Sequence, residues 1–180
     1  MEEVRLMDRE QLVFVDESGS HIALTPLYGW APKGQRAYGA APRNRGHNTT
    51  ILGALSWQGV QAAMLLEGAA DGLAFEAFLE HCLVPTLVAG QIVVLDNLSI
   101  HKSVRVQAMI EKCGCQLLFL PPYSPDFSPI EQMWSKLKQY LRRCAARTKA
   151  ALDAAIAQGL ARINALEAQH WFQHCGYRLL

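Results

Sequence analysis

Three acidic residues of this sequence stand at the boundaries of apolar segments, where their side chains could gather. Asp16 and Asp96 each close a short apolar run, and Glu131 opens a stretch with helical periodicity. Sites in α/β proteins form where strand ends and helix starts meet at one edge of a sheet. No basic residue is placed to pair with these acids, so holding them together is costly unless divalent cations neutralise them. The pattern predicts a metal site made of Asp16, Asp96 and Glu131.

The chemistry of such a site is phosphodiester cleavage. Mg²⁺ takes few carboxylates and keeps water or phosphate oxygens as its other ligands. Two ions roughly 3.5–4 Å apart activate a nucleophile and stabilise the leaving oxygen, with one carboxylate bridging them, for which Asp16 is the candidate. Each acid alone has a simpler explanation: a turn residue, a helix-entry cap beside Asn97, or a first-turn acid favoured by the helix dipole. The hypothesis therefore depends on all three together.

The elements that would position these acids follow from hydrophobic patterning. Strands are predicted at 12–16, 48–57, 60–67, 91–96 and 116–120, and helices at 70–87, 103–112, 129–146, from Thr148 onward and up to Gly176. The first three strands can form an antiparallel meander, and the next two need crossovers and should be parallel, the fourth beside the first. The prediction is an α/β fold: one domain spanning 1–180, with a mixed five-stranded sheet flanked by helices and a long loop at 26–47.

Basic residues concentrate in two windows that contain no acid. The formal net charge is only +1, but 10 of the 17 Lys and Arg residues lie between Glu17 and Glu67 or between Glu131 and Asp153. Such windows favour a polyanion partner through phosphate contacts, although a solvated basic face would look the same. The candidate DNA-binding residues are Lys33, Arg36, Arg43, Arg45, Lys136, Lys138, Arg142 and Arg143.

The helix that begins near Glu131 has two distinct faces. Ile130, Trp134, Leu137 and Leu141 form an apolar stripe, in which Trp134 is interpreted as a core anchor. An adjacent stripe carries Glu131, Ser135, Lys138 and Arg142. A phosphate backbone that crosses the site would meet its basic end.

The five cysteines have neither a disulfide framework nor a zinc-site spacing. We expect reduced thiols in a cytoplasmic protein, since no apolar run is long enough to cross a bilayer and no secretory signal is recognisable.

The stretch LPPYSPDFSPIEQMWSKLK (120–138) closely resembles the signature of the mariner-like transposase superfamily, in its bacterial insertion-sequence branch. The segments FVDES (14–18), WAPKGQ (30–35) and VVLDNLSIH (93–101) match that family in the same order. The separation of 35 positions between Asp96 and Glu131 also agrees with the family. Ser128 stands where the family usually has Asn.

The resemblance implies a ribonuclease-H-like fold, two Mg²⁺ or Mn²⁺ ions, and cleavage and strand transfer at the ends of a transposable element. The family's catalytic, metal-binding acids correspond to Asp16, Asp96 and Glu131, and Asn97, His101, Tyr123 and Pro129 match supporting positions. His101 would contact DNA or orient a carboxylate, or it would only satisfy a helix start. Implied partners are double-stranded DNA and a second copy in a homodimer, with residues 26–47 at the place of an insertion that contacts both. A bacterial, nucleoid-associated location follows.

The family's N-terminal helix-turn-helix DNA reader has no counterpart ahead of the first strand. We therefore expect either the downstream product of a split reading frame, a catalytic domain that works with a helix-turn-helix protein from the upstream frame, or the product of a truncated element. One alternative is a catalytically silent DNA-binding or regulatory remnant that pairs with full-length transposase. Another is a different nuclease of the same fold, such as a ribonuclease H or a junction resolvase, but those enzymes lack the Pro-rich signature.

Overall fold

A five-stranded mixed sheet forms the centre of the molecule. The computed structural model describes residues 8–122 and 124–177. The strands are β1 (Leu12–Ser20), β2 (Thr49–Ser56), β3 (Gly59–Glu67), β4 (Ile92–Leu95) and β5 (Gln116–Phe119), in the order β3-β2-β1-β4-β5. The first three are antiparallel, and β4 and β5 run parallel to β1. The predicted sheet, including the fourth strand beside the first, is confirmed.

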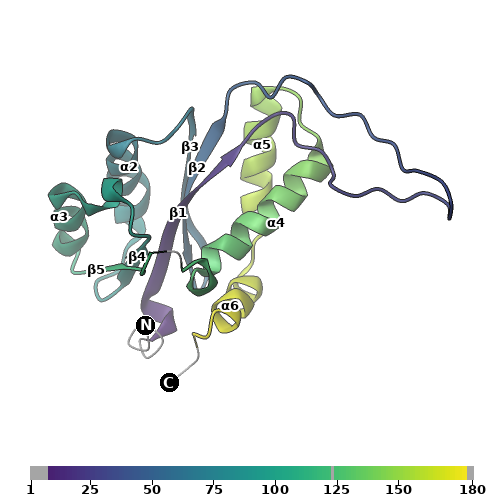
Figure 1. The fold of residues 1–180 in the computed structure, drawn as a ribbon. Helices are drawn as coiled ribbons and strands as arrows, with labels where there is room; N and C mark the ends of the chain where they lie inside the picture. Colours follow the sequence, from purple (N-terminus) through teal and green to yellow (C-terminus); the bar gives the residue numbers. More distant parts are fainter. Residues whose placement is uncertain (1–7, 123, 178–180) are drawn as a thin grey trace.

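Helices cover both faces of this sheet (Figure 1). The helical segments are η1 (Arg9–Gln11), α2 (Gly72–Phe78), the π-helical turn η2 (Leu79–Leu83), η3 (Val84–Thr86), η4 (Ser99–Lys102), α3 (Val104–Lys112), η5 (Pro125–Phe127), α4 (Pro129–Cys144), α5 (Lys149–Leu160) and α6 (Ala165–His174). In Figure 1, α2 and α3 lie on one side of the sheet, and α4, α5 and α6 lie on the other. No helix in the described ranges has the length and apolar character needed to span a membrane.

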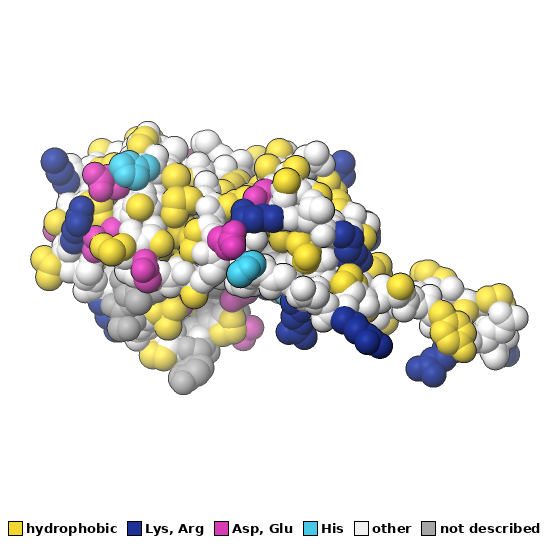
Figure 2. All heavy atoms as spheres, turned by 90° about the horizontal axis from the view of Figure 1, so that it is seen from above, with side chains coloured by type: hydrophobic (Ala, Val, Ile, Leu, Met, Phe, Trp, Pro, Cys, Tyr) yellow, Lys and Arg dark blue, Asp and Glu magenta, His cyan; other side chains and the backbone are white. Residues whose placement is uncertain are grey.

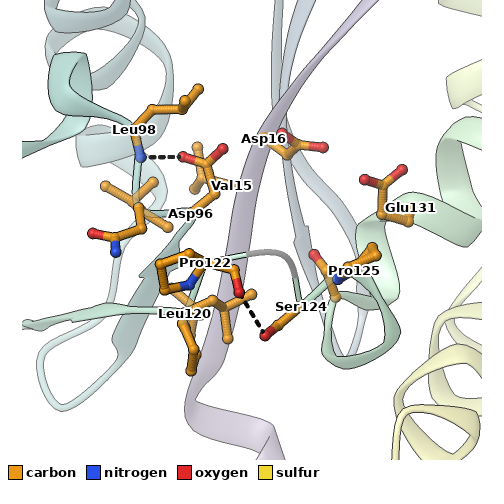
Figure 3. A pocket seen from close by; sticks show the side chains of 14 residues that line it. Val15, Asp16, Asp96, Leu98, Leu120, Pro122, Ser124, Pro125 and Glu131 are labelled. Carbon is orange, nitrogen blue, oxygen red and sulfur yellow. Dashed lines mark hydrogen bonds between the residues drawn. The ribbon is translucent and has the colours of Figure 1, made fainter.

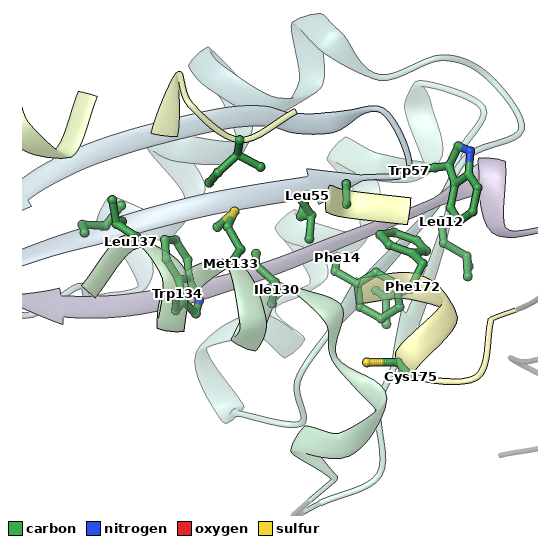
Figure 4. Close-up of a cluster of buried hydrophobic side chains, with 14 of the residues drawn as sticks. Leu12, Phe14, Leu55, Trp57, Ile130, Met133, Trp134, Leu137, Phe172 and Cys175 are labelled. Carbon is green, nitrogen blue, oxygen red and sulfur yellow. The ribbon is translucent and has the colours of Figure 1, made fainter. Parts of the chain in front are cut away.

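Strand alternation divides the interior into two cores. Leu12 and Phe14 of β1 pack with α4, α5 and α6, whereas Val13 and Val15 pack with α2 and α3. Figure 4 shows the first of these cores, in which the rings of Phe14 and Phe172 meet edge to face at 5.3 Å between centroids. Because side chains two apart in a strand share a face, Asp16 lies on the α4 side of the sheet.

The first strand is longer than predicted, and this difference creates the site. We expected Asp16 to end it, but β1 continues to Ser20 because β2 pairs with it from Val13 to Ser20. Pairing with β4 covers only Leu12 to Phe14. Beyond Phe14, no described strand pairs with β1 on the β4 side, and Asp16 lies just past the point where this pairing ends.

Two helix boundaries also differ from the prediction. The segment predicted as one helix over 70–87 is α2 followed by the π-helical and 3-10 turns, with Pro85 at the start of the last. Helix α4 ends at Cys144 because Ala145 adopts the left-handed conformation, at φ 49°. Neither change affects the segments that carry Asp16, Asp96 and Glu131.

Residues 26–47, called the arm from here on, lack regular structure, as predicted, and extend away from the body (Figure 1). The guanidinium of Arg147 holds the start of this excursion, since Nη1 donates to the carbonyl oxygens of Ile22 at 2.8 Å and Leu24 at 3.0 Å. Tyr28 and Trp30 on the arm are almost fully exposed.

Candidate active site

Asp16, Asp96 and Glu131 line one hollow of about 430 Å³, named the carboxylate hollow here. Figure 3 shows their carboxyl groups around this space, from β1, from the end of β4 and from the first turn of α4. Phe14 pairs with Val94 in the parallel register, and Asp16 and Asp96 each follow two residues later, so both reach the same edge of the sheet. The topology therefore gathers the three predicted acids from distant parts of the chain.

No Lys or Arg of the described chain neutralises these acids. No Lys or Arg lines the hollow, and none of the described Lys or Arg residues forms an ion pair with the three carboxylates. Burial raises the pKa of Asp16 to about 6. Hydrogen bonds from the Glu17 backbone and the Trp134 side chain oppose this rise, while the negative charges of Glu131 and Asp96 add to it. Such a site stabilises a protonated acid or a bound cation.

The side chain of Asp96 is fixed by two donors. The Leu98 N–H donates to Oδ1 at 3.1 Å, and His101 Nδ1 lies 2.6 Å from the same oxygen. Burial alone would raise the pKa of Asp96, but the His101 hydrogen bond, the Leu98 amide and the charge of His101 together lower it. Asp96 is therefore held as the ionised form that a metal requires.

The imidazole of His101 is buried, with 1% exposure, and its ring lies 4.3 Å from that of Phe75. An ionised carboxylate only accepts hydrogen bonds, so Nδ1 carries a proton. Nε2 has no hydrogen-bond partner within the described structure. Of the predicted roles for His101, this geometry favours orienting the carboxylate over contacting DNA.

Glu131 is held least firmly of the three acids. It is exposed in the first turn of α4, and no side-chain hydrogen bond or ion pair forms on it within the described residues. Across 8–122 and 124–177, no three His, Cys, Asp or Glu side chains come close enough to hold one ion between them. The oxygen donors fit a hard cation such as Mg²⁺, which needs only one or two carboxylates when water or phosphate oxygens complete its shell.

Comparison with known proteins agrees with this arrangement. The family described as DDE superfamily endonuclease matches residues 11–153, which include all three acids. The chain belongs to this family. A comparison with curated proteins finds no match.

Solved structures share the fold of this DDE-family chain. The Mos1 transposase paired-end complex with left transposon end superposes with a TM-score of 0.78 at 18% identity, over 97% of this chain and 55% of that one. A pre-cleavage Mos1 transpososome gives 0.76 at 17% identity, over 97% and 55%. The catalytic domain of Mos1 mariner transposase gives 0.67 at 14% identity, over 97% and 81%. The chain thus spans about half the length of the first two. The predicted ribonuclease-H-like, mariner-type fold is confirmed.

Among the predicted supporting residues of this DDE-family site, Asn97 lines the carboxylate hollow. Pro129 is buried as the first residue of α4, where a proline ring suits the helix start. Ser128 precedes it and also lines the hollow. Tyr123 lies outside the described residues.

The predicted basic residues fall into separate groups. Lys33, Arg36, Arg43 and Arg45 are carried by the arm. Arg142 and Arg143 line a second hollow, of about 470 Å³, together with Ser135, Gln139 and arm residues 26–28. Figure 2 shows Lys and Arg side chains along the arm and on the adjoining part of the body. A polyanion that crosses the carboxylate hollow would therefore continue toward the base of the arm.

Two further members of the basic set, Lys136 and Lys138, do not line the hollow beside the arm. Lys136 forms an ion pair with Glu167 of α6 and donates to the Arg162 carbonyl oxygen at 3.5 Å. It lines a different hollow, between α4 and α5. Lys138, on the same stripe as Glu131, is half-buried. Arg143 lines both hollows, so Lys136 is distinguished from it by the ion pair with Glu167.

Sequence reasoning missed a functional feature of Trp134. The prediction of a core anchor is confirmed, since the side chain is 2% exposed and packs in the α4 core. Its Nε1–H also donates to Asp16 Oδ2 at 2.9 Å. The position of Trp134 three residues after Glu131 puts it near the site, but only the packing of α4 against β1 shows its acceptor.

Proposed function

We propose that this chain is the catalytic domain of a DNA transposase, which cleaves phosphodiester bonds and joins strands at the ends of a transposable element. The observation that carries the proposal is the carboxylate hollow, where acids from β1, from the end of β4 and from α4 meet and none of the described Lys or Arg residues lines the space. The family match and the Mos1-like fold support this reaction class. Action on DNA would place the protein at the bacterial nucleoid.

Asp16, Asp96 and Glu131 are the proposed ligands of two Mg²⁺ or Mn²⁺ ions. Among the related structures are Mos1 paired-end complexes with Mn and with Mg. Bound ions of this kind activate the attacking water or hydroxyl group and stabilise the leaving oxygen. Asp16 lies between the other two acids in Figure 3 and is coupled electrostatically to both, so it is the proposed shared ligand. Glu131, which forms no side-chain hydrogen bond or ion pair with the described residues, can complete the site when ions and phosphate enter.

Double-stranded DNA is the proposed substrate: the ends of the element are cleaved first and are then joined to a target duplex. Arg142 and Arg143, between the carboxylate hollow and the arm, are placed to contact phosphates on the way to the arm's own basic residues. A homodimer in which the arm contacts the other copy, and a helix-turn-helix protein that selects the element ends, complete the proposal.

The test is metal-dependent cleavage by the purified chain. Supercoiled plasmid and element-end duplexes are incubated with Mn²⁺, with Mg²⁺ or with EDTA, and nicked and joined products are separated on gels. Variants Asp16→Ala, Asp96→Ala and Glu131→Ala are compared with Glu111→Ala, which removes a carboxylate from the exposed face of α3. We expect nicking only with a divalent ion, its loss in all three site variants, and wild-type rates in the control.

Nicking by Asp96→Ala at the wild-type rate would refute the proposed site. If the wild-type chain neither nicks DNA nor gains a carboxylate-dependent rise in melting temperature with Mn²⁺, the silent-remnant alternative holds instead. Cleavage of RNA–DNA hybrids in preference to duplex DNA would indicate a different nuclease of this fold.

A further inference from the structure

The indole of Trp134 connects the α4 core to the carboxylate of Asp16. Its Nε1–H donates to Asp16 Oδ2 across 2.9 Å, although 118 positions separate the two residues. Figure 4 shows Trp134 on α4, beside the sheet and among the core side chains. A buried indole N–H needs an acceptor, and here that acceptor belongs to one of the proposed metal ligands.

A glycine in the neighbouring strand makes room for this indole. Gly53 of β2 is the cross-strand partner of Asp16, and directly opposite residues of antiparallel strands face the same side of the sheet. A Cβ at Gly53 would lie 2.6 Å from Cη2 and 3.1 Å from Cζ2 of Trp134. The indole ring therefore occupies the space that any side chain at position 53 would need. From this position its N–H reaches Asp16 on the adjacent strand.

The hydrogen bond restricts how Asp16 presents its oxygens. The carboxylate of an aspartate rotates easily about its last side-chain torsion, χ2, because the energy minima of that torsion are broad. A donor fixed in a packed core removes that freedom, and a charge-assisted bond of this kind is stronger than a neutral one. With Oδ2 committed to the indole, the carboxylate is held in one orientation at the edge of the hollow.

The three acids thus differ in how firmly they are set before any ion binds. Asp16 is held by an indole N–H and Asp96 by an imidazole N–H, while Glu131 forms no such bond within the described residues. Partners that orient metal-binding side chains commonly control affinity as strongly as some ligands do.

We infer that Trp134, seated on Gly53, is a positioning residue that orients Asp16 for metal binding and not only a core anchor. This role rests on the proposed function of the carboxylate hollow. It requires the N–H specifically, so a ring of the same shape without that donor should pack normally but fail to orient the acid.

The experiment compares removal of the N–H with removal of core packing. Trp134 is replaced by benzothienylalanine, which carries sulfur in place of the N–H, and also by Phe. Gly53→Ala displaces the indole while leaving it in the chain. Trp57→Phe is the control for core damage, because Trp57 is buried in the same core and its N–H forms no hydrogen bond to a site acid in the described structure.

Two measurements are made on each protein. Mn²⁺ affinity is obtained by calorimetric titration, and unfolding by urea is followed in EDTA to report packing alone. We expect about tenfold weaker Mn²⁺ binding for both Trp134 variants and for Gly53→Ala, with near-native stability for the benzothienylalanine protein. Trp57→Phe should bind Mn²⁺ as the wild type does. In metal-free protein, the ¹H–¹⁵N signal of the Trp134 indole should move in Asp16→Ala, and the Trp57 signal should not.

Wild-type Mn²⁺ affinity in the benzothienylalanine protein would overturn the inference, as would equal weakening by Trp57→Phe. If the wild-type chain itself shows no Asp96-dependent response to Mn²⁺, the proposed function fails, and the role of Trp134 fails with it. If the wild type binds Mn²⁺ and the benzothienylalanine protein binds it equally well, only the positioning role of Trp134 is refuted, and the proposed function stands.

Discussion

Replacing Asp16 by Asn should stabilise the metal-free protein while abolishing its response to metal. In the folded chain the pKa of Asp16 rises from 3.8 to about 6, mainly through burial. The ionised acid therefore destabilises the fold at neutral pH. Asn removes the charge, and its amide oxygen can still accept the hydrogen bond from Trp134.

The size of the effect follows from the same pKa values. Each pKa unit corresponds to about 1.4 kcal/mol, so the rise from 3.8 to about 6 is worth about 3 kcal/mol at most. Water in the open hollow screens part of this, and we expect a gain of roughly 1–3 kcal/mol in unfolding free energy. For a chain of this size that is about 2–4 °C in melting temperature per kcal/mol.

Because the pKa of Asp16 is raised in the folded state, the stability gained by Asp16→Asn depends on pH. For an acid whose folded-state pKa is raised, the destabilisation is complete above the folded value near 6 and disappears below the unfolded value of 3.8. The advantage of Asp16→Asn should therefore be greatest at pH 7.5 and fall to roughly a third of that at pH 4.5.

The assay is urea unfolding in EDTA, followed by tryptophan fluorescence, at these two pH values and again with Mn²⁺ at pH 7.5. Asp126→Asn is the control, since Asp126 is exposed at the start of η5 and its replacement should change stability by less than about 0.5 kcal/mol. With Mn²⁺ the order should reverse, because only the wild type gains from the ion. An Asp16→Asn protein no more stable than the wild type at pH 7.5, or equally favoured at pH 4.5, would refute the reasoning.

Two further predictions concern α4 and its neighbours. Gly159→Ala should lower the unfolding free energy by about 1–2 kcal/mol in denaturant titrations, because its Cβ would lie 2.5 Å from Leu137 Cδ1 and this crowding outweighs the better helix propensity of Ala. A stability increase would contradict it. Lys136→Ala should weaken binding to a DNA duplex less than Arg142→Ala, because Lys136 is already paired with Glu167. Affinities measured over a series of salt concentrations check this, and equal changes in the salt slope would show that Lys136 also contacts phosphate.

The strands and the helix that carry the three acids were predictable because local sequence patterns indicate each of them. The continuous apolar run before Asp96 indicates a strand buried on both faces, and Pro129 marks the start of α4. Placement of the fourth strand beside the first follows from chain topology. These local signals were enough to bring Asp16, Asp96 and Glu131 to one hollow.

The contacts that orient the acids were not predictable in the same way. The extension of β1 past Asp16 depends on full-length pairing with β2, and no residue after Asp16 signals it. The seat of Trp134 on Gly53 joins residues 81 positions apart and depends on how α4 crosses the sheet. The charge windows likewise could not reveal that Lys136 turns toward Glu167 while Arg142 faces the arm.

The two acids of the strand region are held from opposite cores of the molecule. Trp134 belongs to the α4 core and holds Asp16, whereas His101 stacks on Phe75 of the α2 core and holds Asp96. The orientation of each carboxylate therefore depends on the packing of the core that holds its hydrogen-bond donor. A substitution that loosens either core, even far from the hollow, should disturb one acid and spare the other. The position of Asp16 relative to Asp96 thus depends on the sheet that lies between the two cores.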